Sequence, residues 1–146
     1  MKSAPPRWNG RDRLPIAVLV DVDGTLAGPY RGGGRQLRES APAALAALAS
    51  KAPVFLWSIT GADNGRRLLA EFPELAAFVT ACFGKEDFPL DRVGRAYCID
   101  DDGLDEAVLR CRHVILGESY EGGPDSGLLA QAASIVLAEI ERDGAT

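Results

Sequence analysis

In the stretch Ile16-Ala-Val-Leu-Val-Asp21-Val-Asp23-Gly-Thr25, an apolar run ends in two aspartates one residue apart. Five consecutive apolar residues predict a strand buried on both faces, as in a parallel sheet. Functional groups of such sheets gather beyond the carboxyl ends of the strands. If the chain stays extended, Asp21 and Asp23 point the same way with their Cα atoms roughly 6–7 Å apart, a gap that fits a phosphoryl group. A solvated turn also accounts for the motif, because Asp and Gly are ordinary turn residues.

The composition is that of a globular chain, with 146 residues of which 47% are hydrophobic and 25% charged. This length predicts one sizeable core in a single domain over residues 16–146. Residues 1–15 are polar and rich in Pro and Arg, and they are predicted to form a flexible arm. The net charge of −5 argues against nucleic-acid binding, which needs a positive face. No apolar run reaches the ~20 residues of a membrane span, and the first residues lack the apolar core of a secretory signal. We therefore expect no membrane partner and a cytoplasmic location.

The cysteines, Cys82, Cys98 and Cys111, lie far apart in the chain and next to apolar residues. This spacing predicts buried free thiols in a reducing compartment. With His113 as the one histidine, a zinc site built from His and Cys is disfavoured.

Apolar runs alternate with helical patterns along the chain. Strands are predicted over residues 16–20, 53–58, 78–83, 96–99 and 113–117, and helices over residues 40–49, 63–72, 105–112 and 128–142. Ser40 is expected as the N-cap of the first helix, with Pro42 in its first turn. The alternation predicts an α/β, three-layer Rossmann-like fold, with a five-stranded parallel sheet and helices on both faces.

Polar side chains follow the apolar runs. They are Asp21 and Asp23 after the first strand, Ser58 after the second, Lys85 just past the third, and Asp100 and Asp101 after the fourth. Because parallel strands end at the same edge of a sheet, these groups should converge there. Crowded carboxylates raise one another's pKa values unless a cation neutralises them. Oxygen ligands suit Mg²⁺, so the pattern predicts a site for Mg²⁺ and a phosphate.

This order of motifs resembles that of the haloacid dehalogenase-like (HAD) superfamily of phosphohydrolases. The stretch from Asp21 to Thr25 is similar to the first motif of the family, and Ser58 and Lys85 are similar to the second and third. The pair Asp100-Asp101 is similar to the fourth motif. The resemblance spans nearly all of the predicted folded domain and identifies it as a catalytic domain.

The resemblance implies a Mg²⁺-dependent phosphomonoesterase. Asp21 would form a phosphoaspartyl intermediate, and Asp23 would act as general acid and then as general base. The substrate-binding residues implied are Gly24, Thr25, Ser58 and Lys85, and the last two also count as catalytic. The metal ligands implied are a carboxylate oxygen of Asp21, the backbone carbonyl of Asp23, and Asp100 or Asp101.

Several of these assignments have competitors nearby in the sequence. Thr60 competes with Ser58, and Arg92 or Arg95 could replace Lys85. Because Asp102 follows the acidic pair, the direct metal ligand stays open, with Asp100 favoured as the nearest to its strand.

A second set of open assignments concerns loops. Tyr30, Arg31 and Arg35 flank three successive glycines and form either a substrate flap or a mobile surface loop. Tyr120, in the glycine-rich loop after the fifth strand, is a weaker candidate for a substrate contact.

Residues 26–53 and 86–95 are too short to hold the lid domain that many HAD relatives carry. The resemblance therefore implies a capless member, which acts on a phosphorylated small molecule or macromolecule. Exclusion of water would then come from the substrate, the flap or a partner subunit, so a homo-oligomer is also considered. The residues do not name the substrate.

Two other functions use similar residues. A phosphorylatable receiver domain carries acids, a hydroxyl and a lysine at its strand ends, but its phospho-accepting Asp follows strand three and its Lys follows strand five. Here Phe83-Gly84 and Gly117-Glu118 stand at those places. A non-catalytic Mg²⁺-binding interaction module is the other alternative.

Overall fold

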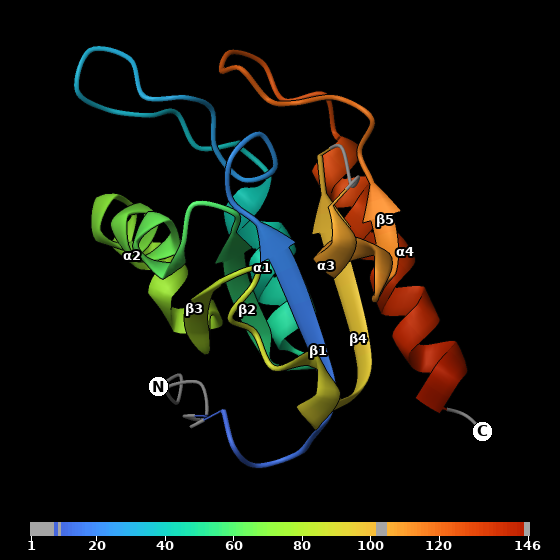
Figure 1. Ribbon diagram of the computed structural model, residues 1–146. Coiled ribbons are helices and arrows are strands. Elements are labelled where there is room, and N and C mark those ends of the chain that lie inside the picture. Colours follow the sequence, from blue (N-terminus) through green and yellow to red (C-terminus); the bar gives the residue numbers. More distant parts are fainter. Residues whose placement is uncertain (1–7, 9, 102–104, 145–146) are drawn as a thin grey trace.

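The computed structural model describes residues 8, 10–101 and 105–144. Over these residues the chain forms a five-stranded parallel sheet with the strand order β3-β2-β1-β4-β5 (Figure 1). The strands are β1 (Leu14–Asp21), β2 (Val54–Ser58), β3 (Ala81–Gly84), β4 (Val93–Asp100) and β5 (Arg112–Ile115). The predicted α/β, Rossmann-like fold is confirmed.

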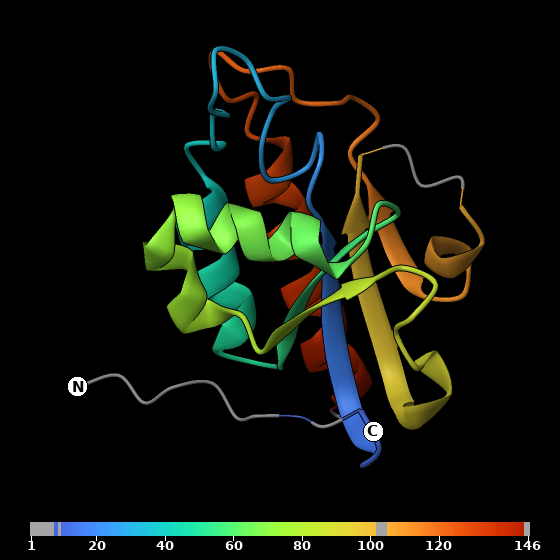
Figure 2. The same cartoon turned by 60° about the vertical axis from the view of Figure 1, so that its left-hand side comes forward.

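Helices cover both faces of the sheet, but unequally (Figures 1 and 2). One face packs against α1 (Ala41–Ala49), α2 (Ala62–Glu71) and α4 (Leu128–Gly144). The other face is covered by the short helix α3 (Glu106–Leu109) and by an aromatic cluster. Among the described helices, none has the length and apolar character that a membrane crossing requires.

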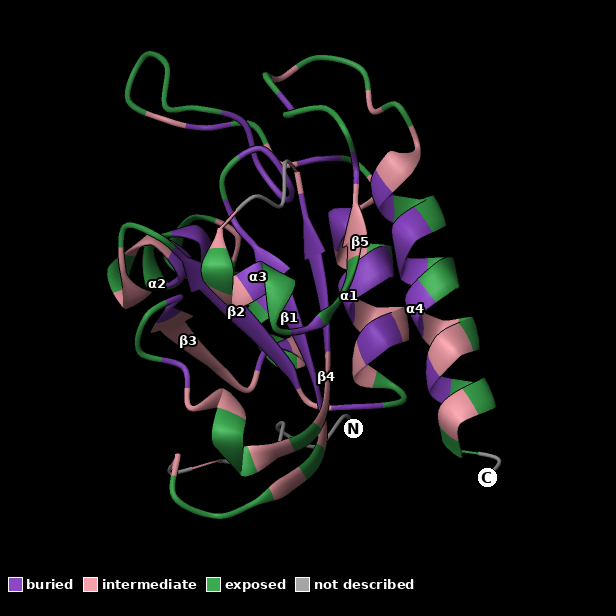
Figure 3. Ribbon diagram, turned by 45° about the vertical axis from the view of Figure 1, so that its right-hand side comes forward, coloured by how far each residue is buried: buried purple, intermediate pink, exposed green. Residues whose placement is uncertain are grey.

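The central strand β1 is buried on both faces, which explains its uninterrupted apolar sequence (Figure 3). Val18 and Val20 belong to the core beneath the long helices. Ala17 and Leu19 point into the opposite core. Since successive side chains of a strand alternate between faces, a strand covered on both sides must be apolar at every position.

The second core contains aromatic rings from distant parts of the chain. Phe55 and Phe88 lie with their ring centroids 5.1 Å apart, and Trp8 lies 5.2 Å from Phe55 and 5.4 Å from Phe88. Trp8 therefore connects the predicted arm to the sheet, and Leu14 and Pro15, which the sequence placed in that arm, belong to β1. Residues 1–7 lie outside the described part.

The predicted start of the third strand was wrong. The third strand was expected to begin at residue 78, but Pro73–Phe78 form a 3₁₀ helix and β3 begins at Ala81. Pro73 explains the difference, because its fixed φ favours the first turn of a helix. Ser40 is the N-cap of α1 with Pro42 in the first turn, as predicted. Its hydroxyl makes no capping hydrogen bond and donates instead to Asp125 Oδ2 at 2.6 Å.

The thiols behave largely as predicted. Cys98 and Cys111 are buried free cysteines, whereas Cys82 is half-buried. Burial raises the pKa of the Cys82 thiol to about 11, which keeps this group protonated at neutral pH.

The strand order reverses direction at β1. The strands β2 and β3 lie on one side of it, and β4 and β5 lie on the other. Open α/β sheets bind ligands in the crevice beyond such a switch point, at the carboxyl ends of the strands. The register pairs Val20 with Ile99, so the next residues, Asp21 and Asp100, end neighbouring strands at this place.

Candidate functional site

An acidic cluster lies at the switch point of the sheet. One carboxylate oxygen each from Asp21, Asp100 and Asp101 lie within 4.8 Å of one another. Asp21 is 7% exposed and Asp100 only 1% exposed, so two of these carboxylates are removed from bulk water. Of the acids that the sequence placed after the first and fourth strands, the structure thus brings together Asp21, Asp100 and Asp101. Asp102 lies outside the described residues.

Lys85 reaches the cluster from the loop after β3. Its Nζ donates to Asp100 Oδ2 at 2.6 Å and to Asp105 Oδ2 at 2.8 Å, and it lies 3.4 Å from Asp21 Oδ1. The backbone N–H of Lys85 donates to the carbonyl of Ser58, which attaches this loop to the end of β2. Lys85 is therefore a buried cation shared between carboxylates.

The two arginines that competed with Lys85 lie elsewhere. Arg95 pairs with Ile16 in the amino-terminal part of the sheet, and its guanidinium donates to the Tyr97 hydroxyl. Arg92 ends the 3₁₀ helix that precedes β4. Both positions are at the amino end of β4, whereas the acids are at its carboxyl end.

Burial makes the ionised cluster unfavourable in the absence of a further cation. Burial raises the pKa of the Asp21 carboxyl well above its usual range, and the negative charges of Asp100 and Asp101 raise this pKa further. The Lys85 charge and the hydrogen bond from Thr25 lower it, but by less. Burial alone would lower the pKa of the Lys85 ammonium, but its carboxylate partners outweigh that effect and raise it. Lys85 is therefore held as a cation, and its single charge leaves the cluster negative.

The donor set fits a hard divalent cation. Carboxylate oxygens are the protein ligands that Mg²⁺ takes, usually with waters and substrate oxygens in its remaining positions. Asp21, Asp100 and Asp101 are the residues that would hold it. The carboxylate of Asp23 is not in this cluster.

Addition of Mg²⁺ is expected to stabilise the protein against thermal unfolding. The gain is about 2.7 kcal/mol when free Mg²⁺ reaches about 100 times its Kd. The raised pKa of Asp21 determines the pH range in which Mg²⁺ stabilises the protein. Its favourable contribution to folding is complete below the unfolded pKa of about 3.9 and is lost as pH rises through the folded pKa. The Mg²⁺-dependent rise in Tm should therefore be large at pH 7–8 and small at pH 4.

Calorimetry or a thermal-shift titration measures this rise. The matched control is Asp63→Asn, which removes an exposed acid of α2 paired with Arg66 and should leave the Mg²⁺ effect intact. A Tm independent of Mg²⁺ across this pH range would contradict a metal site at the cluster.

The Asp23 carboxylate is not part of the acidic cluster, and β1 ends two residues before Asp23. β1 ends at Asp21 and the chain turns, with the N–H groups of Thr25 and Leu26 both donating to the carbonyl of Val22. The Asp23 side chain is 58% exposed. Asp21 thus belongs to the buried cluster, whereas Asp23 has hydrogen-bond partners of its own and is largely open to solvent.

Asp23 and Ser58 are joined by Asn64, which the sequence did not indicate, and Asp23 also pairs with Arg35 of the candidate flap. Arg35 Nη2 donates to Asp23 Oδ1 at 2.5 Å, and Asn64 Nδ2 donates to Asp23 Oδ2 at 2.8 Å. Asn64 Nδ2 also lies 2.9 Å from Ser58 Oγ, which in turn shares a 2.9 Å hydrogen bond with Thr60 Oγ1. Ser58 and its competitor Thr60 therefore belong to one network, with Ser58 the buried member.

Close packing of α2 on the sheet brings Asn64 to this network. Its neighbour Gly65 faces β3 so closely that a Cβ there would lie 3.0 Å from Cys82 Sγ. One sequence signal could have indicated Asn64 as a site residue: it lies in the first turn of the helix that follows Ser58, the hydroxyl at the end of β2.

Gly24 and Thr25 shape the turn after β1. Gly24 has φ of 78°, and a Cβ at this position would lie 2.2 Å from Ser119 Oγ and 2.4 Å from Asp101 Oδ2. The Thr25 hydroxyl donates to Asp21 Oδ2 at 3.1 Å. Glycine is therefore needed for the close approach of Asp101, and Thr25 orients the Asp21 carboxylate.

The loop that carries Tyr30, Arg31 and Arg35 folds back on itself and lies against α2. The Tyr30 hydroxyl donates to Glu71 Oε1 at 2.7 Å, and the Arg35 guanidinium lies 4.8 Å from the centre of the Tyr30 ring. The Arg35 side chain is 1% exposed, whereas that of Arg31 is 72% exposed. These contacts connect the loop to Asp23 through Arg35.

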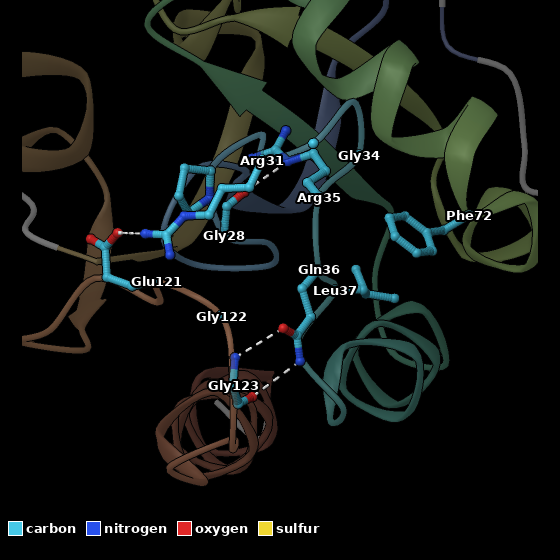
Figure 4. A pocket seen from close by; sticks show the side chains of 12 residues that line it. Gly28, Arg31, Gly34, Arg35, Gln36, Leu37, Phe72, Glu121, Gly122 and Gly123 are labelled. Atoms are coloured by element: carbon cyan, nitrogen blue, oxygen red, sulfur yellow. Dashed lines mark hydrogen bonds and ion pairs between the residues drawn. The ribbon is translucent and has the colours of Figure 1, made fainter.

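A cavity of about 990 Å³ separates this loop from the loop at residues 121–123 (Figure 4). Gln36 bridges the two loops by accepting from the N–H of Gly123 at 2.9 Å and donating to its carbonyl at 3.3 Å. Arg31 reaches across the opening toward Glu121 at 3.8 Å. Arg35 lines the cavity and contacts Asp23, so the cavity adjoins the proposed acid/base residue.

Asp105 is another site residue that the sequence did not indicate as such. It is the N-cap of α3, where its Oδ1 accepts from the Val108 N–H at 3.0 Å, and its second oxygen accepts from Lys85. An aspartate before a helix is a recognisable capping signal. Its contact with Lys85 depends on the tertiary fold.

Comparison with known proteins does not assign the chain to a family. No protein-family model matches it, and no curated protein matches it. The arrangement of the residues therefore carries the functional inference.

Proposed function

We propose that the protein is a Mg²⁺-dependent phosphomonoesterase of the HAD-like type, with Asp21 as the nucleophile. The observation that supports this most directly is the position of Asp21. It is a buried carboxylate at the switch point, clustered with Asp100 and Asp101 and 3.4 Å from the Lys85 ammonium. A nucleophile needs this combination of orientation and positive charge to approach a phosphate.

The two oxygens of Asp21 have different partners. Thr25 donates to Oδ2, and Lys85 lies beside Oδ1. The hydroxyl therefore orients the carboxylate, while the ammonium offsets the repulsion between carboxylate and phosphate. A bound Mg²⁺ would add positive charge at the acids and polarise the phosphoryl group.

The proposed reaction has two steps. An oxygen of Asp21 attacks phosphorus, and the bond to the alcohol oxygen breaks as that oxygen takes a proton from the Asp23 carboxyl. Water then attacks phosphorus, gives a proton to the Asp23 carboxylate, and the bond to the Asp21 oxygen breaks to release phosphate. The solvent exposure of Asp23 suits this exchange of protons.

The second site element is the hydroxyl network at the end of β2. Ser58 Oγ is a buried hydroxyl held by Asn64 and Thr60, and it is the proposed donor to an oxygen of the transferring phosphoryl group. The cavity beside Arg35 is the proposed space for the remainder of the substrate.

Strand order favours this proposal over a receiver domain. Receivers have the order 2-1-3-4-5, in which β1 and β3 are neighbours at the switch point. Here the order is β3-β2-β1-β4-β5, so β4 is the neighbour of β1. The residue at the end of β3 is Gly84, which has no carboxylate to phosphorylate.

The purified protein is expected to release phosphate from a generic aryl phosphate in the presence of Mg²⁺. The activity should disappear with a chelator and return when Mg²⁺ is restored. A panel of phosphometabolites and phosphopeptides would then define the leaving group. If Mg²⁺ raises Tm but no substrate in the panel releases phosphate, the non-catalytic Mg²⁺-binding module becomes the better interpretation.

A further inference from the structure

Arg38 is a fully buried cation just before α1, outside the acidic cluster. Its guanidinium donates from Nε to the carbonyl of Thr25 at 2.7 Å and from Nη2 to the carbonyl of Gly24 at 3.2 Å. Nη1 donates to Ser126 Oγ at 3.4 Å, and the group lies 4.7 Å from the centre of the Tyr120 ring. Arg38 therefore joins the turn after β1 to the loop before α4.

The charge of Arg38 is balanced by Asp125. The guanidinium lies 3.5 Å from Asp125 Oδ1, and the Asp125 side chain is 8% exposed. Burial would raise the pKa of Asp125, but hydrogen bonds from Ser40 and Gly127 and the charge of Arg38 outweigh it and lower the pKa. The two residues thus form a buried ion pair between the segment before α1 and the loop before α4.

We propose that Arg38 is a positioning residue of the active site, which acts on Asp21 through Thr25. Arg38 holds the backbone of Thr25, and the Thr25 hydroxyl holds Asp21 Oδ2. This inference rests on the proposed function, because it assigns to Arg38 the orientation of the nucleophile.

The chemistry of the guanidinium supports a geometric role. A buried ion pair commonly adds little stability over an apolar pair of similar volume, because desolvation offsets the attraction. What arginine adds is a rigid, planar set of donors that can hold two carbonyls at fixed positions. Arg38→Lys would keep the positive charge and lose the planar set of donors that contacts both carbonyls.

The turn that Arg38 holds has little freedom to shift. Thr25 is fully buried, and Gly24 already lies against Asp101 and Ser119. A displacement of the turn would therefore move Asp21 relative to Asp101. Misplacement of a reacting group by 1 Å can reduce the rate about 100-fold.

Arg38→Lys tests the proposal. We expect kcat to fall by about 10–100-fold with KM little changed, and the affinity for Mg²⁺ to weaken by about tenfold. Titration calorimetry measures Mg²⁺ binding without any need for activity. The control is Arg112→Lys. Arg112 begins β5 and pairs with Asp143 of α4, so this substitution should leave kcat and the Mg²⁺ affinity unchanged.

A double-mutant cycle with Thr25→Val distinguishes positioning from general destabilisation. If Arg38 acts through the Thr25 hydroxyl, the double variant should have the same kcat as Thr25→Val alone. Losses that multiply would overturn the proposed route through Thr25. If Arg38→Lys does not fold, Asp125→Asn takes its place, with smaller losses in the same direction.

The outcomes separate this inference from the proposed function. If the wild type hydrolyses phosphate esters and Arg38→Lys retains its kcat and Mg²⁺ affinity, the role of Arg38 is wrong and the phosphatase stands. If the wild type releases no phosphate, the Mg²⁺ titration alone decides. Weaker Mg²⁺ binding by Arg38→Lys then supports the proposal that Arg38 positions Asp21, and unchanged Mg²⁺ binding overturns that proposal.

Discussion

Asp21→Asn is expected to reduce phosphatase activity by about 10⁴–10⁶-fold, the loss that accompanies removal of a nucleophile. The amide can still accept the hydrogen bond from Thr25, so the fold and the turn after β1 should persist. Phosphate release with saturating Mg²⁺, compared with the wild type in the same preparation, measures the effect. Activity undiminished by this substitution would contradict the proposed mechanism.

The same substitution should make the metal-free protein more stable. Asp21 has a raised pKa in the fold, so at pH 7 its ionised form opposes folding, and asparagine removes that charge. We expect a gain of about 0.5–2 kcal/mol in the free energy of unfolding, within the range of single stabilising substitutions. Thermal unfolding with a chelator at pH 7 measures it, and the stabilisation by Mg²⁺ should shrink in the variant. A loss of activity together with a loss of stability would instead indicate misfolding.

Lys85→Met is expected to destabilise the protein by about 3–5 kcal/mol, because removal of one partner leaves buried charges uncompensated. Asp21, Asp100 and Asp105 all face the Lys85 ammonium, whose side chain is 4% exposed. Urea unfolding at pH 7 measures the loss. Mg²⁺ should recover part of it by neutralising the same carboxylates.

The pH dependence of this loss follows from the raised pKa of Lys85. The contribution of Lys85 to stability is complete below its unfolded pKa of about 10.4 and disappears as pH rises through the higher folded pKa. The control is Lys51→Met, since Lys51 is half exposed and lies 3.8 Å from Glu141. Such surface pairs contribute about 0–1 kcal/mol, so an equal effect of the two variants would contradict the role of Lys85 in the cluster.

The fold and part of the site follow from local sequence patterns. The apolar run of β1 indicated a strand covered on both faces, and the alternation of elements indicated parallel strands. Since parallel strands end at one edge, the sequence could place Asp21, Asp100 and Lys85 together without any knowledge of side-chain contacts. The competitors Arg92 and Arg95 failed because they lie at the opposite end of β4.

The class of fold, the acids at the switch point and the lysine among them could thus all be predicted from local sequence patterns. The hydrogen bonds of Asp23 with Arg35 and Asn64, in contrast, could be seen only in the folded chain. The same holds for the hydrogen bonds of Arg38 to the turn after β1. The difference lies in the range of the interactions, because burial and strand ends leave periodic, local patterns in a sequence. The path of a loop and the partner of a side chain depend on segments that meet only when the whole chain has folded.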